Sequence, residues 1–365
     1  MSLVDMVAAF ITQVRQSRQF CRAIAPVLTY DRAALITEVA DGVHRIESVF
    51  GGRLLYVYLL IGEDASILVD SGASVTAQET LLGALERLGV DPTLLLVTHP
   101  DLDHQGGNSA VRRAYPGTQV ACGAGDEAQV ADPRTLVARR YSAFEYDHGV
   151  GFPTEAKPNL VRLAGSIPVA VDRVFCGGER LRLGPDWTVE ILHLPGHSSG
   201  HLGVLDPRSK SAVVADAAHG SDYPHADGSP WALMPTYYHL EPYLRTAEDL
   251  RALELDAVHS AHWPVAEKGG VSERLDETVA YALRADRLVF ELVEGGRSTL
   301  RDLMDEALPL LGEWSRSTIG DFACSVHAHL ERFADAGLVE AHTDDGMLHY
   351  RAVQEYQPPH TGEVQ

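Results

Sequence analysis

Apolar runs and helical patterns alternate along most of the chain. Three runs, VHRIESVF, LLYVYLLIG and ASILVDSG, are separated by Gly-Gly and by acidic turns, and they predict successive strands between residues 43 and 72. A helix should follow, because Thr76 and Glu79 have the spacing of a capping box and four leucines share one face up to Gly89 (Leu81, Leu82, Leu85 and Leu88). The next apolar run, residues 94–98, predicts a buried strand that ends at His99.

The second half of the chain repeats this order. Residues 189–194, 212–215 and 255–260 predict strands, and residues 240–253 predict a helix. Strands that alternate with helices are typical of an α/β protein. Each of these strands ends at, or just before, a histidine or an aspartate, and strand ends are the usual place for a site on such a sheet.

The pattern changes towards the carboxyl end. Helices are predicted over 284–295, 298–308 and 317–336, and a turn at Asp344-Asp345-Gly346 leads to a last strand over 347–353. Three helices and a hairpin predict a winged-helix module. We therefore expect four parts: an N-terminal helical extension (1–37), a catalytic domain (38–270), a small winged-helix-like α+β domain (285–353) and a flexible tail (354–365).

The composition excludes several classes of protein. A chain of 365 residues with 45% hydrophobic residues can bury a sizeable core, so it is not disordered as a whole. Its net charge of −21 repels phosphate backbones and anionic lipid, so we expect neither nucleic acid nor membrane as a partner. There is no apolar run of membrane-spanning length and no secretory signal, which predicts a cytoplasmic protein. Four cysteines without a CxxC pair fit thiols in a reducing compartment (Cys21, Cys122, Cys176 and Cys324).

The main chemical signal is the segment Thr98-His99-Pro100-Asp101-Leu102-Asp103-His104-Gln105-Gly106-Gly107. Two imidazoles and two carboxylates lie within six residues at the end of a buried strand, and they are ligands expected for zinc, iron or manganese. Two carboxylates this close repel each other unless a cation lies between them. The alternative is a polar loop in which Asp103 caps the next helix.

Three later strand ends carry the same residue types. His197 lies in Pro195-Gly196-His197, Asp216 ends the strand over 212–215, and His262 follows the strand over 255–260. Each of them alone fits a helix cap or a hydrogen-bonded core histidine. Together with residues 99–104 they predict one metal centre.

In this ordered set the sequence resembles the metallo-β-lactamase superfamily, over roughly residues 38–265. The resemblance implies an αββα sandwich with a dinuclear metal centre at one edge of its two sheets. It also implies a role for each residue: His99 and His197 bind the first metal, Asp103, His104 and His262 the second, Asp216 bridges them, and Asp70 orients the site without binding metal.

One position departs from the family's pattern. The second histidine of the HxHxDH motif is here Asp101, so the motif is HxDxDH. Asp101 could bind the first metal, which adds a hard anionic oxygen and suits iron or manganese better than zinc alone. Alternatively the short side chain does not reach, and the centre is effectively mononuclear. We expect ligation, and two divalent ions, zinc first among the candidates.

Two segments are candidate walls of a substrate pocket. The stretch from His219 to His239 follows Asp216 and is rich in glycine, proline and aromatic residues, with Tyr223, His225, Trp231, Tyr237 and Tyr238 as candidates for substrate contact. The insertion over 135–160 is a candidate lid. A plain surface loop with packed aromatic side chains is the alternative for the first segment.

These residues favour a metal-dependent hydrolase of a small molecule. Water bound to the cations would lose a proton and attack an ester, lactone, thioester or amide carbonyl, with Asp103 and Asp216 holding the nucleophile. One alternative is an iron-dependent oxidoreductase similar to the persulfide dioxygenases.

Another alternative is a nuclease or nucleic-acid-binding protein, because a similar winged module follows the catalytic domain in one branch of the superfamily. Residues 285–365 hold 6 Arg, no Lys and 15 Asp plus Glu, and this net charge of 6 − 15 = −9 opposes nucleic-acid binding. We expect the module to be a pocket wall or a contact in a homodimer.

Overall fold

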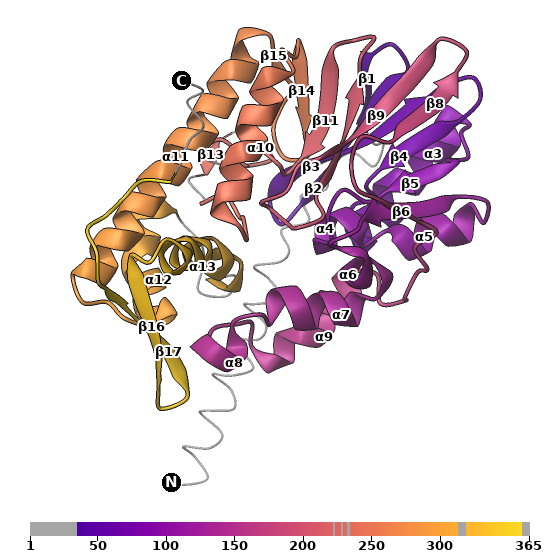
Figure 1. Ribbon diagram of the computed structural model, residues 1–365. Helices are drawn as coiled ribbons and strands as arrows, with labels where there is room; N and C mark the ends of the chain where they lie inside the picture. The colour runs from indigo at the N-terminus through magenta and orange to yellow at the C-terminus, as the bar shows by residue number, and fades with distance from the viewer. Residues whose placement is uncertain (1–34, 222, 228, 232–233, 313–318, 360–365) are drawn as a thin grey trace, which may run out of the picture.

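The computed structural model describes residues 35–221, 223–227, 229–231, 234–312 and 319–359 (Figure 1). The predicted N-terminal helical extension lies outside these residues, except that 35–37 belong to a strand and not to a helix. Cys122, Cys176 and Cys324 form no disulfide in the described part, and Cys21 lies outside it. None of the helices seen in these ranges combines the length and the apolarity that crossing a bilayer requires.

Two mixed sheets form the centre of the molecule. The first has seven strands in chain order: β1 (Leu35–Ala40), β2 (Val43–Phe50), β3 (Arg53–Ile61), β4 (Ser66–Val69), β5 (Leu94–Leu96), β6 (Gln119–Gly123) and β7 (Arg173–Phe175). The second has the order β15-β14-β11-β10-β9-β8, with β8 (Arg180–Gly184), β9 (Trp187–His193), β10 (Leu202–Asp206), β11 (Ser211–Ala215), β14 (Ala257–Ser260) and β15 (Ala266–Glu267). In the first sheet, β4 pairs with β5, β5 with β6 and β6 with β7, all in parallel. In the second sheet, β11 and β14 are parallel.

Strand β3 shows why the two sheets pack face to face. Its residues Tyr56, Tyr58 and Leu60 join the apolar core between the sheets, whereas Val57 and Leu59 join the core under the helices of the first sheet. Successive side chains of a strand point to opposite faces, so a run that is apolar at every position has to be covered on both sides. The unbroken apolar run that the sequence contains therefore requires a layer on each face.

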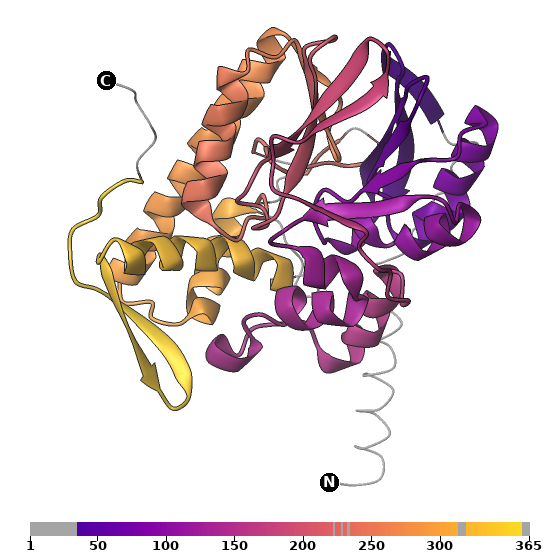
Figure 2. The same cartoon turned by 45° about the vertical axis from the view of Figure 1, so that its right-hand side comes forward.

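Helices cover the outer face of each sheet (Figure 2). On the first sheet these are α2 (Ser74–Thr76), η1 (Ala77–Leu81), α3 (Leu82–Leu88), α4 (Leu102–Gln105), α5 (Asn108–Ala114) and α6 (Glu127–Ala131). On the second sheet α10 (Leu240–Ala252) and α11 (Gly269–Glu294) bury a separate core. The order helix, sheet, sheet, helix is the αββα sandwich that the sequence predicts, and the α/β fold class is confirmed.

The insertion between β6 and β7 is helical. It contains α7 (Pro133–Leu136), the π-helical turn η2 (Val137–Tyr141), α8 (Glu145–His148), the short turn η3 (Thr154–Ala156) and α9 (Lys157–Leu163). Figure 1 shows these helices below the sandwich, beside the carboxyl-terminal helices. The insertion thus contacts both the sandwich and the carboxyl-terminal part of the chain.

The carboxyl-terminal part consists of α11, α12 (Leu300–Leu311), α13 (Ile319–Asp335) and the hairpin β16 (Val339–Asp344) and β17 (Met347–Ala352), which turns after Asp344 as predicted. A second small hairpin, β12 (Tyr223–Pro224) with β13 (Pro230–Trp231), lies in the loop after β11. The helices and the hairpin at the end of the chain are present, and their winged-helix classification stays a prediction.

Three local features differ from the sequence prediction. The helix after β4 begins at Ser74, and the Thr76 hydroxyl donates to the Ala73 carbonyl, so the capping box is wrong. Helix α11 begins at Gly269 because its apolar face continues through the segment that separated the two predicted domains. The predicted flexible tail is anchored at Tyr356, whose hydroxyl donates to the buried carboxylate of Asp286.

The buried His259 on β14 should make the fold sensitive to acid. Burial lowers the pKa of His259 from 6.5 to about 4, and neither ring nitrogen has a partner among the described residues. The unfolded chain then binds a proton below pH 6.5 that the folded chain does not, so stability falls with pH between 6.5 and 4. We expect His259→Leu to reduce the loss of unfolding free energy between pH 7.5 and pH 5 by about 2 kcal/mol.

Urea unfolding of the variant and the parent at the two pH values measures this difference. His342→Leu, at an exposed position of the β16–β17 hairpin, is the control and should leave the pH dependence unchanged. An equal loss in His259→Leu and the parent would contradict the prediction.

Candidate metal centre

The metal ligands expected from the sequence lie together at one edge of the two sheets. His99, Asp101, Asp103 and His104 follow β5, His197 lies between β9 and β10, Asp216 follows β11 and His262 follows β14. The structure contains four groups of three residues whose ligand atoms lie within 4.8 Å of one another inside each group. The groups share members and form one cluster: His99, Asp101 and His197; His99, His104 and Asp216; Asp103, His104 and His262; His197, Asp216 and His219. We call the first of these the first position. Asp103, His104, Asp216 and His262 are the second position.

The turns that carry these residues have specific backbone requirements. Asp70 and Ala215, which precedes Asp216, adopt positive φ angles of 66° and 45°, a conformation that is strained for residues with a side chain. Gly196, before His197, has φ 132°, and a Cβ there would lie 2.4 Å from the Cα of Tyr243. Only glycine fits at this turn, which sets the direction of His197.

The second position has the spacing of a metal shell. His104 Nε2 lies 3.5 Å from Asp216 Oδ2, His262 Nε2 lies 3.5 Å from the same oxygen, and His262 Nε2 lies 3.7 Å from Asp103 Oδ2. Donors at tetrahedral positions about 2.1 Å from a zinc ion would be roughly 3.4 Å apart. Asp103 lies inside α4 and contacts Arg53 and His262, so it does not cap the helix.

Hydrogen bonds on the far side of the imidazoles aim their lone pairs into the second position. His104 Nδ1 lies 2.8 Å from Asp70 Oδ2, and His262 Nδ1 donates to the Leu54 carbonyl at 2.9 Å. Asp70 also accepts from the backbone and hydroxyl of Thr98. Such carboxylate–histidine pairs fix the ring and raise its basicity towards a metal.

A proton competes for His104. Burial alone would lower its pKa, but the carboxylates of Asp216 and Asp70 outweigh burial and raise the pKa of His104 well above its usual value. A cation that takes the Nε2 lone pair has to displace this proton, so cation binding weakens as pH falls.

One buried atom on each of His99, His104 and Asp216 has no hydrogen-bond partner among the described residues: His99 Nε2, His104 Nε2 and Asp216 Oδ1. An unpaired buried polar group costs about 1–3 kcal/mol, and native structures contain few of them. A divalent cation bound between these atoms would satisfy all three. The donor set of imidazole and carboxylate is also right for such an ion, so the residues fit a metal centre.

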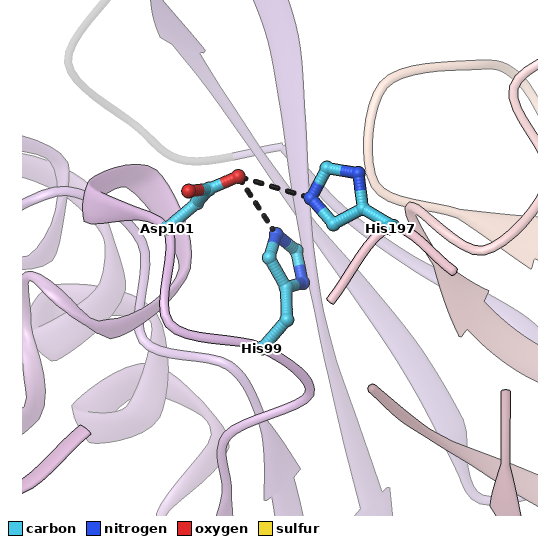
Figure 3. A group of neighbouring side chains, drawn as sticks. All are labelled: His99, Asp101 and His197. Carbon is cyan, nitrogen blue, oxygen red and sulfur yellow. Dashed lines mark hydrogen bonds and ion pairs between the residues drawn. The ribbon is translucent and has the colours of Figure 1, made fainter. Parts of the chain in front are cut away.

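The first position is arranged differently (Figure 3). Asp101 Oδ2 lies 3.5 Å from His99 Nε2 and 3.0 Å from His197 Nε2. The same carboxylate forms a two-pronged ion pair with Arg140 of η2 and accepts from the Tyr141 hydroxyl. Burial alone would raise the pKa of Asp101, but Arg140 and the two imidazoles hold it well below its usual range.

Sequence analysis did not find Arg140 or His219. Nothing in the sequence distinguishes Arg140 from its neighbour Arg139, because the contact with Asp101 depends on how the insertion folds. His219 is fully buried, three residues after Asp216, with its Nε2 3.7 Å from Asp216 Oδ2. Burial lowers its pKa well below the usual value, so its ring is neutral at pH 7. The one signal in the sequence that could have identified His219 is its spacing of three residues from Asp216.

The candidate pocket residues lie in different surroundings. The Tyr223 hydroxyl is 3.3 Å from His219 Nε2, and the Tyr238 ring lies under the Arg140 guanidinium. Tyr237 is fully buried, and its hydroxyl donates to His329 of α13. His225 pairs with Arg53 through a β-bridge, and the side chain of Trp231 is outside the described part.

This geometry places a buried cluster of histidines and aspartates that could hold divalent cations at the sheet edge of an αββα sandwich. The model of the metallo-beta-lactamase superfamily matches residues 51–262, more than half of the chain. The chain belongs to this superfamily, as the motif in the sequence indicated.

Relatives with assigned names are distant. The hydroxyacylglutathione hydrolase GloC of Haemophilus influenzae is 26% identical over 171 residues, which are 45% of this chain and 69% of that protein. A hydroxyacylglutathione hydrolase of Mesorhizobium japonicum is 26% identical over 37% of this chain, and the match spans only 38% of that protein. These matches support a hydrolase in general terms.

Solved structures share the fold over most of the chain. A metallo-beta-lactamase family protein from Thermus thermophilus has a TM-score of 0.65 at 20% identity and covers 87% of this chain and all of its own. A beta-lactamase domain protein from Burkholderia ambifaria has a TM-score of 0.67 at 19% identity and covers 90% of this chain and 99% of its own. The shared fold therefore extends beyond the sandwich.

Asp70 should control metal affinity without binding the metal. In Asp70→Asn the side chain keeps its shape and tolerates the positive φ, but it loses the charge that supports His104. We expect the affinity for zinc to fall about 10- to 100-fold. Competition with a chromophoric chelator measures it.

Asp172→Asn is the matched control, because that carboxylate also accepts a backbone N–H beside a strand but lies away from the centre. Unchanged zinc affinity in Asp70→Asn would show that Asp70 has no influence on the ligands.

Proposed function

We propose that this protein is a metal-dependent hydrolase that cleaves the ester or thioester bond of a small molecule. The observation that carries the proposal is the set of three unpaired buried atoms, on His99, His104 and Asp216, inside a shell of imidazoles and carboxylates. Support for a thioester comes from the two distant relatives, which are named hydroxyacylglutathione hydrolases. Lactones and amides belong to the same class of carbonyl substrate.

Asp103, His104, Asp216 and His262 would hold a divalent cation. Such an ion supplies Lewis acidity and a water-derived nucleophile at neutral pH. The chain's own residues fix the geometry: Asp70 and the Leu54 carbonyl hold two of the imidazoles, and the strained turn at Ala215 presents Asp216.

Arg53 contacts the second position through Asp103 and also reaches solvent. Its Nη2 donates to Asp103 Oδ2 at 3.1 Å, its guanidinium lies over the Tyr223 ring, and its side chain is 20% exposed. A fixed cation beside the ligands offsets their negative charge and can pair with an anionic group of the substrate. We propose that Arg53 and Tyr223 form the substrate side of the centre.

Two alternative functions, a nucleic-acid-acting protein and an iron-dependent oxidoreductase, are distinguished from the proposed hydrolase by the experiment below. A nuclease or nucleic-acid-binding function is opposed by the net charge of −21 and by the absence of any Lys in residues 285–365. An iron-dependent oxidoreductase would contain iron and consume oxygen.

The proposal is tested on protein purified without added metal and then loaded with zinc or manganese. A panel of thioesters, lactones, aryl esters and phosphodiesters should show hydrolysis of carbonyl substrates only, and His262→Ala should lose at least about 100-fold in kcat/KM because the ligand shell is broken. His193→Ala, an exposed histidine of β9, should keep parental activity. Phosphodiester cleavage alone, or oxygen uptake on a persulfide, would replace the proposed function.

Removal of the metal should lower stability as well as activity. Without a cation the carboxylates of the cluster repel one another and three polar atoms stay unpaired. At a free zinc concentration 100-fold above Kd, binding adds about 2.7 kcal/mol to the unfolding free energy.

Thermal melts with chelator and after reloading measure this effect, and Tm should rise on reloading. The same Tm in both states would mean that the cluster does not bind the metal.

A further inference from the structure

The insertion between β6 and β7 places one arginine inside the first position. Arg140, on η2, is buried and pairs with both oxygens of Asp101: Nε donates to Oδ1, and Nη2 donates to Oδ2 at 2.8 Å. The Tyr141 hydroxyl adds a third hydrogen bond, 3.1 Å from Oδ1. Each oxygen of this carboxylate therefore already has a donor.

Arg140 also uses the lone pair of a histidine ligand. His197 Nδ1 donates to the Thr236 carbonyl at 2.6 Å, so in the neutral ring Nε2 carries the lone pair that a metal would need; this nitrogen also lies 3.0 Å from Asp101 Oδ2. Arg140 Nη2 lies 3.1 Å from this Nε2, and a guanidinium can only donate. The guanidinium and a cation therefore compete for the same atom of His197.

The guanidinium is held in place from several sides. Its carbon lies 4.3 Å from the centre of the Tyr238 ring, and the Tyr238 hydroxyl donates to the Arg140 carbonyl. Its Nη1 approaches the backbone carbonyl of His197 at 3.4 Å. A forked pair with a buried carboxylate is among the stronger side-chain contacts, so Arg140 belongs to the resting centre.

The second position keeps ligand atoms that are open to a cation. Arg53 donates to Asp103 Oδ2 at 3.1 Å, whereas Arg140 pairs with both oxygens of Asp101. His104 Nε2 and Asp216 Oδ1 stay without hydrogen-bond partners in the described part of the chain. His99 Nε2 lies within reach of His104 and Asp216 as well, so it can serve this position.

We propose that the Arg140 guanidinium takes the place of the first cation, so that the protein binds one divalent ion tightly, at the second position. Arg140 offsets the charge of Asp101 and occupies the lone pair of His197. In a dinuclear centre, the Asp101 carboxylate and the His197 lone pair would both bind a metal. The proposal rests on the proposed function only in that the second position binds a cation.

The number of tightly bound ions tests the proposal. Parent protein and Arg139→Met, an exposed arginine of the same turn, should retain about one zinc ion per chain after dialysis against micromolar zinc, and Arg140→Met should retain about two. Met keeps much of the length of the side chain and removes the donors. Two tight ions in the parent, or one in a folded Arg140→Met protein, would overturn the proposal.

A measurement on the parent protein makes the test independent of how the variant folds. Loaded with excess manganese and desalted, the parent should give the electron paramagnetic resonance spectrum of an isolated ion, and a spin-coupled pair would overturn the proposal. A parent that binds no metal would remove the proposed function itself. Two tight ions would remove only the role of Arg140.

Discussion

The structure depends on the electrostatics of one buried cluster. Asp70, Asp101, Asp103 and Asp216 lie at most 15% exposed among imidazoles, in a chain whose net charge is already −21. Buried carboxylates at this spacing need positive charge close by. The protein supplies part of it through Arg53 and Arg140, and we propose that an ion at the second position supplies the rest. The strained turns at Asp70 and Ala215, and the hydrogen bonds that fix the imidazoles, hold these charged groups at short distances from one another.

Much of the fold could be predicted from the sequence because burial leaves a strong pattern. The apolar run of β3 requires cover on both faces, and the strand ends at His99, Asp216 and His262 follow directly from the alternation of strands and helices. The residues predicted as ligands lie together in the structure because strand ends converge at one edge of a sheet. The start of α11 was predicted too late, although Val271 and Leu275 already have the i, i+4 spacing of a helix face.

What the sequence could not show is contact between distant segments. Arg140 and Arg139 are equivalent in the sequence, and only the turn η2 directs one of them to Asp101. His219 and His201 look like ordinary core histidines until the structure places them beside the ligands. The sequence offered two alternatives for Asp101, a metal ligand or a side chain too short to reach the metal. Neither alternative included Arg140, which pairs with both oxygens of this carboxylate.

The loop after β13 has a consequence for how the protein is made. Its Thr236 carbonyl holds His197, and the next residue, Tyr237, is fixed by His329 and by Ser325 of α13. All the candidate ligands precede α13 in the chain and are synthesised before it. The segment that orients His197 is held on one side by the Gly196 carbonyl, which accepts from the N–H groups of Tyr238 and His239, and on the other side by α13. Part of the support for His197 is therefore synthesised after every candidate ligand, and the orientation of this ring depends on a helix far from it in the sequence.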